Sequence, residues 1–167
     1  MCGICGFVSR KGPSLEQLKR MNNTMRHRGP DDGGEEIFPA KDGYQVGMAQ
    51  RRLSIMDLSS LGHQPMHSVD RRVSVVYNGE IYNFRELKKE LSDYPFRSEC
   101  DTEVIIAAYL RWGIKCVERL NGMFAICLYD RAEQNVYLIQ ELRKYLPPYF
   151  FPKSFSAHYG FELGGKH

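Results

Sequence analysis

The stretch MCGICGF at residues 1–7 decides how the rest of this chain is interpreted. Residues 2–8 form a short apolar run with two glycines, a pattern that predicts a buried strand approached closely by another backbone. Cys2 is small enough for Met1 to be removed, which would leave Cys2 with a free α-amino group. Such an amine has an unperturbed pKa of about 7.7–8, so part of it is a base near neutral pH. Cys2 would then carry a thiol nucleophile and a general base on one residue.

Strand and helix patterns alternate along the residues that follow. Ser14 and Gln17 match a capping box that opens a helix through about Met25, and the Gly-, Pro- and Asp-rich residues 26–34 are typical of a loop. Further elements are expected as strands at 44–49, 51–55, 72–77, 123–129 and 136–139, helices at 83–92 and 102–112, and a turn at 130–135. Asp101 is expected to be the N-cap of the second of these helices. Strands dominate, with helices inserted between them, which predicts an α+β or layered α/β domain.

Composition places the chain among globular proteins. Of its 167 residues, 43% are hydrophobic and 26% are charged, which excludes wholesale disorder and fibrous repeats. A net charge of +3 is too small to indicate a nucleic-acid partner, and no apolar run reaches the ~18 residues that cross a bilayer. The N-terminus lacks the layout of a secretory signal, and five cysteines is an odd number for a disulfide framework. We therefore expect a cytoplasmic protein with reduced thiols that binds neither nucleic acid nor membrane.

Several motifs follow the N-terminal stretch in order. They are MRHRGPDDGG (25–34), RLSIMDLS (52–59), QPM (64–66), YNGEIYNFREL (77–87), CDTEVI (100–105) and LNGMFAICLYD (120–130). With MCGICGF they resemble the N-terminal glutaminase domain of glutamine-hydrolysing asparagine synthetases, which are class II glutamine amidotransferases. The resemblance implies a layered αββα fold of the N-terminal-nucleophile (Ntn) hydrolase type, with two stacked, mostly antiparallel sheets. It also implies hydrolysis of L-glutamine to glutamate and ammonia through a Cys2 thioester, the ammonia being destined for ATP-dependent asparagine synthesis.

The same resemblance assigns roles to individual residues. Cys2 would attack the glutamine side-chain amide, while the Asn78 amide and the Gly79 backbone N–H would face the developing oxyanion. Arg52 would bind the α-carboxylate through its planar guanidinium, and Asp101 and Glu80 would receive the α-ammonium. The predicted glutamine-binding set also includes Leu53, Ser54, Ile55 and Met56. No metal or cofactor is expected in this chain, since ATP and Mg are expected only in a synthetase domain that it lacks.

Each of these residues also has a purely structural interpretation. Arg51 and Arg52 can be an exposed charge pair, and Asp101 can be only a helix cap. Asn78-Gly79 alone is typical of a type I′ hairpin turn. An inactive truncated fragment, or a module that binds glutamine without turning it over, is therefore the alternative function. The implied partners are L-glutamine and a synthetase domain or subunit, and a homodimer is left open.

A zinc site is the main rival interpretation of the cysteines. Cys2 and Cys5 form C-x2-C, and His63 and His67 form H-x3-H, which are the ligand types of a Cys2His2 site. However, the 57 residues between Cys5 and His63 far exceed the spacer of a zinc finger. The cysteines other than Cys2 are instead expected to be core thiols, namely Cys5, Cys100, Cys116 and Cys127.

The resemblance weakens after about residue 138. Residues 138–167 hold seven of the 20 aromatic residues and three of the eight prolines, and no Gly-rich phosphate loop appears. We therefore divide the chain into a glutaminase domain at 1–137 and a divergent aromatic-rich tail at 138–167, with no ATP-binding synthetase domain. Part of this tail, Leu146–Phe155, is expected to pack on the second sheet, but Pro147-Pro148 argues against a paired central strand there.

Overall fold

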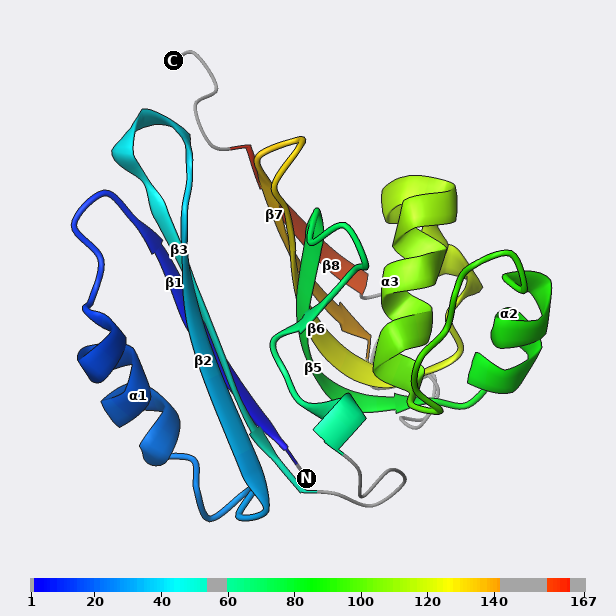
Figure 1. The fold of residues 1–167 in the computed structure, drawn as a ribbon, viewed down its shortest axis with the longest axis horizontal. Coiled ribbons are helices and arrows are strands. Elements are labelled where there is room, and N and C mark those ends of the chain that lie inside the picture. Colours follow the sequence, from blue (N-terminus) through cyan, green and yellow to red (C-terminus); the bar gives the residue numbers. More distant parts are fainter. Residues whose placement is uncertain (1, 54–59, 142–155, 163–167) are drawn as a thin grey trace, which may run out of the picture.

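The computed structural model describes residues 2–53, 60–141 and 156–162, which form two antiparallel sheets packed face to face with helices outside them (Figure 1). The first sheet has the order β1-β3-β2, with β1 at Gly3–Ser9, β2 at Asp32–Pro39 and β3 at Gln45–Arg52. The second has the order β4-β5-β6-β7-β8, with β4 at Met66–His67, β5 at Val73–Ile81, β6 at Gly122–Asp130, β7 at Asn135–Glu141 and β8 at Ser156–Glu162. This architecture confirms the predicted layered αββα fold.

The helices cover the outer faces of the two sheets. Helix α1 (Leu15–Asn23) lies on the first sheet, α3 (Asp101–Trp112) lies on the second, and α2 (Phe84–Glu90) packs against α3 (Figure 1). The described residues also contain 3-10 helices at Lys41–Gly43, Ser60–Gly62 and Gly113–Arg119. Within the described residues, no helix combines the length and the apolar character that crossing a membrane requires.

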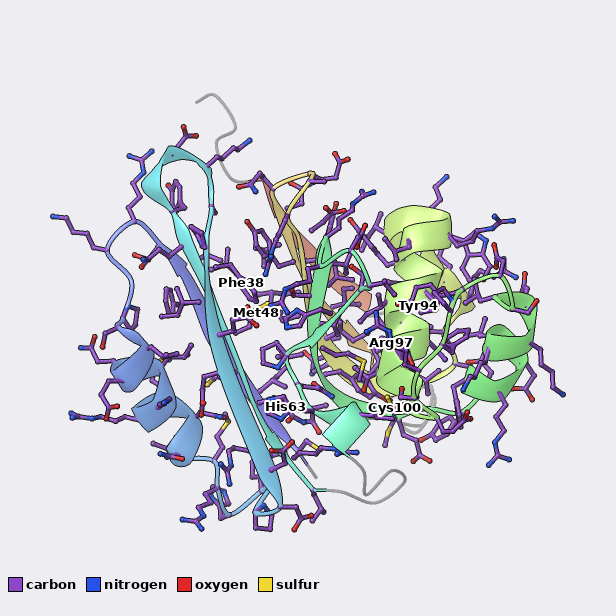
Figure 2. All side chains as sticks on the ribbon, viewed as in Figure 1. Phe38, Met48, His63, Tyr94, Arg97 and Cys100 are labelled. Atoms are coloured by element: carbon purple, nitrogen blue, oxygen red, sulfur yellow. The ribbon has the colours of Figure 1, made fainter. Side chains whose placement is uncertain are left out.

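Alternation along the strands creates two separate cores. Val75 and Tyr77 of β5 face α3 and belong to the larger core, whereas Val76 between them faces the first sheet. There it meets Phe38 and Met48 in a smaller core, which Figure 2 shows between the sheets. Further along the same inter-sheet faces, Met48 of β3 is followed by Gln50 and Arg52, and Val76 of β5 is followed by Asn78. The space between the sheets therefore becomes polar at one end, and the candidate site lies there.

The first helix begins as its sequence predicts. The Ser14 hydroxyl accepts a hydrogen bond from the Gln17 N–H at 3.3 Å, and the Gln17 side chain accepts one from the Ser14 N–H at 2.8 Å. The capping box is thus confirmed, although α1 ends at Asn23 rather than near Met25.

Three sequence predictions of local structure are wrong. The loop expected at 26–34 is shorter, because residues 32–34 already belong to β2, where they pair with β3. β3 is one continuous strand instead of two segments with a break. Cys100, not Asp101, is the N-cap of α3, and the Asp101 carboxylate instead accepts hydrogen bonds from Tyr77 and Ile81 of β5.

The second sheet continues into the segment that the sequence sets apart as a tail. The expected boundary at residue 137 falls within β7, and β8 pairs antiparallel with β7 from Asn135↔Glu162 to Glu141↔Ser156. β8 begins after the proline pair and lies at the edge of the sheet. Leu146–Phe155 lies outside the described residues, so its packing stays a prediction.

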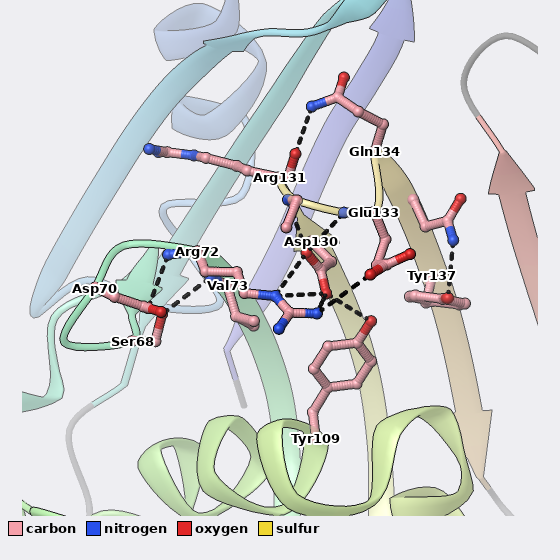
Figure 3. A network of polar contacts seen from close by, with 12 residues as sticks. Ser68, Asp70, Arg72, Val73, Tyr109, Asp130, Arg131, Glu133, Gln134 and Tyr137 are labelled. Carbon is pink, nitrogen blue, oxygen red and sulfur yellow. Dashed lines mark hydrogen bonds and ion pairs between the residues drawn. The ribbon is translucent and has the colours of Figure 1, made fainter.

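A buried carboxylate of β6 binds Arg72, the residue before β5, and Tyr109 of α3 at the end of the second sheet (Figure 3). Asp130 has 0% exposure and accepts hydrogen bonds from the Arg72 guanidinium at 2.8–3.2 Å and from the Tyr109 hydroxyl at 3.1 Å. Burial alone would raise the pKa of the Asp130 carboxyl, but the hydrogen bonds from Arg72, the Glu133 N–H and Tyr109 hold it below its usual value. This ionised group therefore stabilises the fold at neutral pH.

Removing the arginine from this network should destabilise the protein. We expect Arg72→Ala to lower the free energy of unfolding, measured by urea denaturation at pH 7, by about 2–4 kcal/mol because it leaves a buried carboxylate without its cation. The difference from wild type should shrink as the pH falls below ~4, where the carboxyl becomes protonated first in the unfolded chain. Arg20→Ala, which breaks an exposed pair with Glu16, should cost less than ~0.5 kcal/mol. Equal losses in the two variants would contradict this account.

Candidate active site

A cavity of about 480 Å³ lies where the inter-sheet space becomes polar. Its volume falls in the range of small-molecule sites. The predicted site residues that line it are Cys2, Arg52, Leu53, Asn78, Gly79, Glu80 and Asp101. Ser54, Ile55 and Met56 lie outside the described residues. The structure thus brings together side chains from β3, β5 and α3 with Cys2, although they are up to 99 residues apart in the sequence.

Cys2 is positioned by the pairing of β1 with β3. Gly3 of β1 pairs with Arg51 of β3. Cys2, the residue before Gly3, therefore lies beside the end of β3. The Leu53 N–H donates to the Cys2 Sγ at 3.4 Å, and the Arg28 Nε donates to the Cys2 carbonyl oxygen at 3.1 Å. The half-buried thiol is therefore fixed at the cavity wall with a backbone donor directed at its sulfur.

Asn78, Gly79 and Glu80 lie within β5, which excludes the hairpin-turn interpretation of Asn78-Gly79. Gly79 pairs with Phe124 of β6. A Cβ on Gly79 would collide with the Met123 carbonyl and the Phe124 backbone, so glycine is needed for the two strands to approach. Alternation places the Asn78 side chain on the inter-sheet face, the same face that carries Arg52 on the opposite sheet.

Arg52 ends β3 and is 9% exposed, so the exposed-pair interpretation is wrong for this arginine. A Cβ on Gly62 would collide with its guanidinium, and glycine there makes room for it. Asp32 lies nearby and pairs with His63 at 2.8 Å. Burial alone would raise the pKa of Asp32, but hydrogen bonds from His63 and the Gly33 N–H and the charge of Arg52 lower it.

The two carboxylates of the cavity differ in their surroundings. Asp101 is 9% exposed and accepts hydrogen bonds from the Tyr77 hydroxyl at 2.6 Å and the Ile81 N–H at 3.2 Å, whereas Glu80 is exposed. Burial raises the pKa of Asp101 despite these two donors. Burial and the neighbouring Asp101 also raise the pKa of Tyr77, which therefore remains a donor. A cationic group bound beside Asp101 would favour its ionised form.

Sequence reasoning missed two buried glutamines that line this cavity. Gln64 belongs to the QPM motif, and its Oε1 accepts from the Tyr77 N–H at 2.7 Å while its Nε2 donates to the Thr102 hydroxyl at 3.2 Å. Gln50 belongs to none of the motifs, and it lines the cavity with 1% exposure. A motif signal existed for Gln64, whereas only the strand pairing of β3 reveals Gln50.

The zinc interpretation is not supported. Over the described ranges, no group of three or more His, Cys, Asp or Glu side chains is arranged to hold a metal. His63 pairs with Asp32, and His67 lies 3.0 Å from the Glu36 carboxylate. Ile4 packs between the sheets, so its neighbour Cys5 faces the opposite side of β1, near Glu35. Cys5 is therefore half-buried and belongs to neither core, contrary to the prediction of a core thiol. Cys100 and Cys116 belong to the core as expected, and Cys127 packs against the inter-sheet core.

Comparison with known proteins extends the resemblance to glutamine amidotransferases over nearly the whole chain. The sequence model of the glutamine amidotransferase domain matches residues 1–159. A putative glutamine-hydrolysing asparagine synthetase 2 from Methanocaldococcus jannaschii is 36% identical over 181 aligned residues, covering 99% of this chain and 35% of that protein. The glutamine-hydrolysing asparagine synthetase 2 from Bacillus subtilis is 37% identical, covering 90% of this chain and 20% of that protein. The chain therefore spans about a third or less of these curated relatives.

A solved structure shows the same fold. Glutamine phosphoribosylpyrophosphate amidotransferase from B. subtilis superposes with a TM-score of 0.60 at 16% identity, covering 84% of this chain and 40% of that chain. This similarity confirms the predicted Ntn fold class. The family match also continues beyond residue 138, into the segment predicted to be a divergent tail. With a match that runs from residue 1 to residue 159, the chain belongs to the family of glutamine amidotransferase domains.

Proposed function

We propose that this domain hydrolyses L-glutamine to L-glutamate and ammonia, with Cys2 as the nucleophile. The observation that carries the proposal is the set of groups around one cavity, which matches a free amino acid with a side-chain amide. Arg52 offers a guanidinium for an α-carboxylate, and Asp101 and Glu80 offer carboxylates for an α-ammonium. The Cys2 thiol and Asn78 remain for the side-chain amide. Glutamine within a peptide lacks both backbone charges and would be rejected.

The reaction can be written through the groups of Cys2 itself. With Met1 removed, the Cys2 α-amine takes the thiol proton as the sulfur attacks the glutamine Cδ. The amide oxygen becomes an oxyanion that accepts hydrogen bonds from the Asn78 side-chain amide and the Gly79 N–H. Collapse of this intermediate breaks the C–N bond, the α-ammonium returns the proton to the departing nitrogen, and ammonia leaves. Water then attacks the γ-glutamyl thioester with the amine as base, releasing glutamate and the free thiol.

The fate of the ammonia is the second part of the proposal. Both curated relatives described above bear the name of glutamine-hydrolysing asparagine synthetases. We therefore propose that the ammonia serves ATP-dependent asparagine synthesis in a synthetase domain or subunit, which would bind ATP and Mg. All five cysteines are free, in keeping with a cytoplasmic location.

Glutamate release from L-glutamine by the purified chain tests this function. The protein is first checked by intact mass for removal of Met1, and glutamate and ammonia are then measured without ATP. Equal amounts of both products are expected. Binding of L-glutamine by calorimetry without any glutamate would show a binding module instead, and absence of both binding and turnover would refute the proposal.

Substrate binding should depend strongly on one arginine. We expect Arg52→Ala to raise the KM for glutamine by about 10- to 100-fold with little change in kcat, because a hydrogen-bonded charge pair to the α-carboxylate is lost. Steady-state kinetics of glutamate release measure this effect. The neighbouring Arg51 donates to the Gly29 carbonyl at 3.0 Å and does not line the cavity, so Arg51→Ala is the matched control with an unchanged KM. A similar rise in both variants would remove Arg52 from the site.

A further inference from the structure

One buried polar side chain of the cavity, that of Gln50, has no hydrogen-bond partner among the described residues. Gln50 is 1% exposed, and neither its Oε1 nor its Nε2 makes a hydrogen bond with any described residue. The other described residues with such unpartnered buried atoms, Asn22, Arg131 and Asn135, do not line the cavity. A buried polar group left without a partner costs about 1–3 kcal/mol, so an unsatisfied amide in this position requires an explanation.

The position of Gln50 on β3 explains why no neighbour on its own sheet satisfies it. Gln50 pairs with Ile4 of β1 on one side and with Gly34 of β2 on the other. The Ile4 side chain is apolar, and Gly34 has no side chain, so neither can form a hydrogen bond with the Gln50 amide. Alternation places Gln50 on the inter-sheet face between Met48 and Arg52, with Arg52 about 7 Å further along the strand. The amide therefore lies between the apolar core and the charged part of the cavity.

The proposed function leaves one group of the substrate that Gln50 can bind. In the proposed function, the glutamine α-carboxylate is bound by Arg52, the α-ammonium by Asp101 and Glu80, and the amide oxygen by Asn78 and Gly79. The two N–H groups of the carboxamide nitrogen have no acceptor in this assignment. Gln64 Oε1 is already engaged by the Tyr77 N–H, and Gln140, the third glutamine that lines the cavity, is exposed. Gln50 Oε1 is an acceptor without a donor.

We propose that Gln50 binds the reacting carboxamide nitrogen of the substrate, its Oε1 accepting a hydrogen bond from that nitrogen. This inference rests on the proposed glutamine hydrolysis. As the C–N bond breaks, the nitrogen becomes pyramidal and must receive a proton from the Cys2 α-ammonium. An acceptor that holds one N–H fixes the direction of the nitrogen lone pair and orients it for that proton. Gln50 thus orients the leaving group and discriminates an amide from an ester.

Two substrates that differ only in the leaving group test this role. L-glutamine has two N–H groups on its leaving nitrogen, and the γ-methyl ester of L-glutamate has none. Gln50→Met preserves side-chain length and removes both polar atoms. We expect it to lower kcat/KM for glutamine by about 10- to 100-fold and to change kcat/KM for the ester by less than about threefold. Gln45→Met, at the exposed start of the same strand, is the matched control and should affect neither substrate.

The outcomes separate this inference from the proposed function. Equal loss on both substrates, or no loss on either, would overturn the role of Gln50 while leaving glutamine hydrolysis established by the wild type. Wild-type protein that hydrolyses neither substrate would refute both. The thermal midpoint without substrate gives an independent readout, because removing an unsatisfied buried amide should not lower it. A large drop in Gln50→Met and in Gln50→Leu alike would assign Gln50 a structural role instead.

Discussion

Cys2→Ala is expected to abolish glutamine hydrolysis, lowering the rate of glutamate release by about 10³-fold or more. Without the sulfur no thioester can form, and the remaining groups of the cavity can only bind and polarise the substrate. The fold should be unaffected, because the Cys2 side chain is half-buried at the cavity wall rather than in either core. Glutamate release measures the loss, and calorimetry with L-glutamine should show that binding persists.

Cys5→Ala is the matched control for this substitution. Cys5 lies three residues along the same segment but faces away from the cavity, where burial and the nearby Glu35 raise its thiol pKa. The variant should therefore keep most of the activity. Comparable loss in both variants would show that the effect arises from disturbing β1 and not from removing a nucleophile.

Asn78→Ala should give the second-largest loss, lowering kcat by about 10²- to 10³-fold with little change in KM. A donor aimed at the amide oxygen binds the ground state weakly and the oxyanion strongly, so its loss appears in the rate of the chemical step. Saturation kinetics of glutamate release separate the two constants. Asn23→Ala at the exposed end of α1 is the control and should leave both unchanged. A rise in KM alone would show that Asn78 does not stabilise the oxyanion.

The elements that the sequence predicts well are those whose local signals agree with their tertiary setting. β5 and β6 have apolar alternation or apolar runs because they lie at the centre of the second sheet, and α1 has a complete capping box. β2 was missed because its sequence is rich in Gly and acidic residues, which serve tertiary contacts. A Cβ on Gly34 would collide with the Gln64 carbonyl, and Glu36 pairs with His67 and Arg71.

The site shows a similar division between local and long-range information. Motifs identify Arg52, Asn78 and Asp101 as residues of interest, and the structure places them at one cavity. The position of the Asp101 carboxylate was not predictable, because its hydrogen bonds to Tyr77 and Ile81 cross from α3 to β5 and compete with helix capping. Gln50 carries no local signal at all. Its significance depends on having Ile4 and Gly34 as neighbours, which only the register of three strands determines.

Trapping the γ-glutamyl thioester tests the proposed role of Cys2 most directly. Protein without Met1 is mixed with L-glutamine, quenched with acid during turnover and analysed by peptide mass mapping. One γ-glutamyl group on Cys2 is predicted, and none is predicted in Cys2→Ala or in protein that retains Met1, where the base is blocked. Glutamate release by protein that never carries this group on Cys2, or an adduct on another residue, would contradict the proposed mechanism.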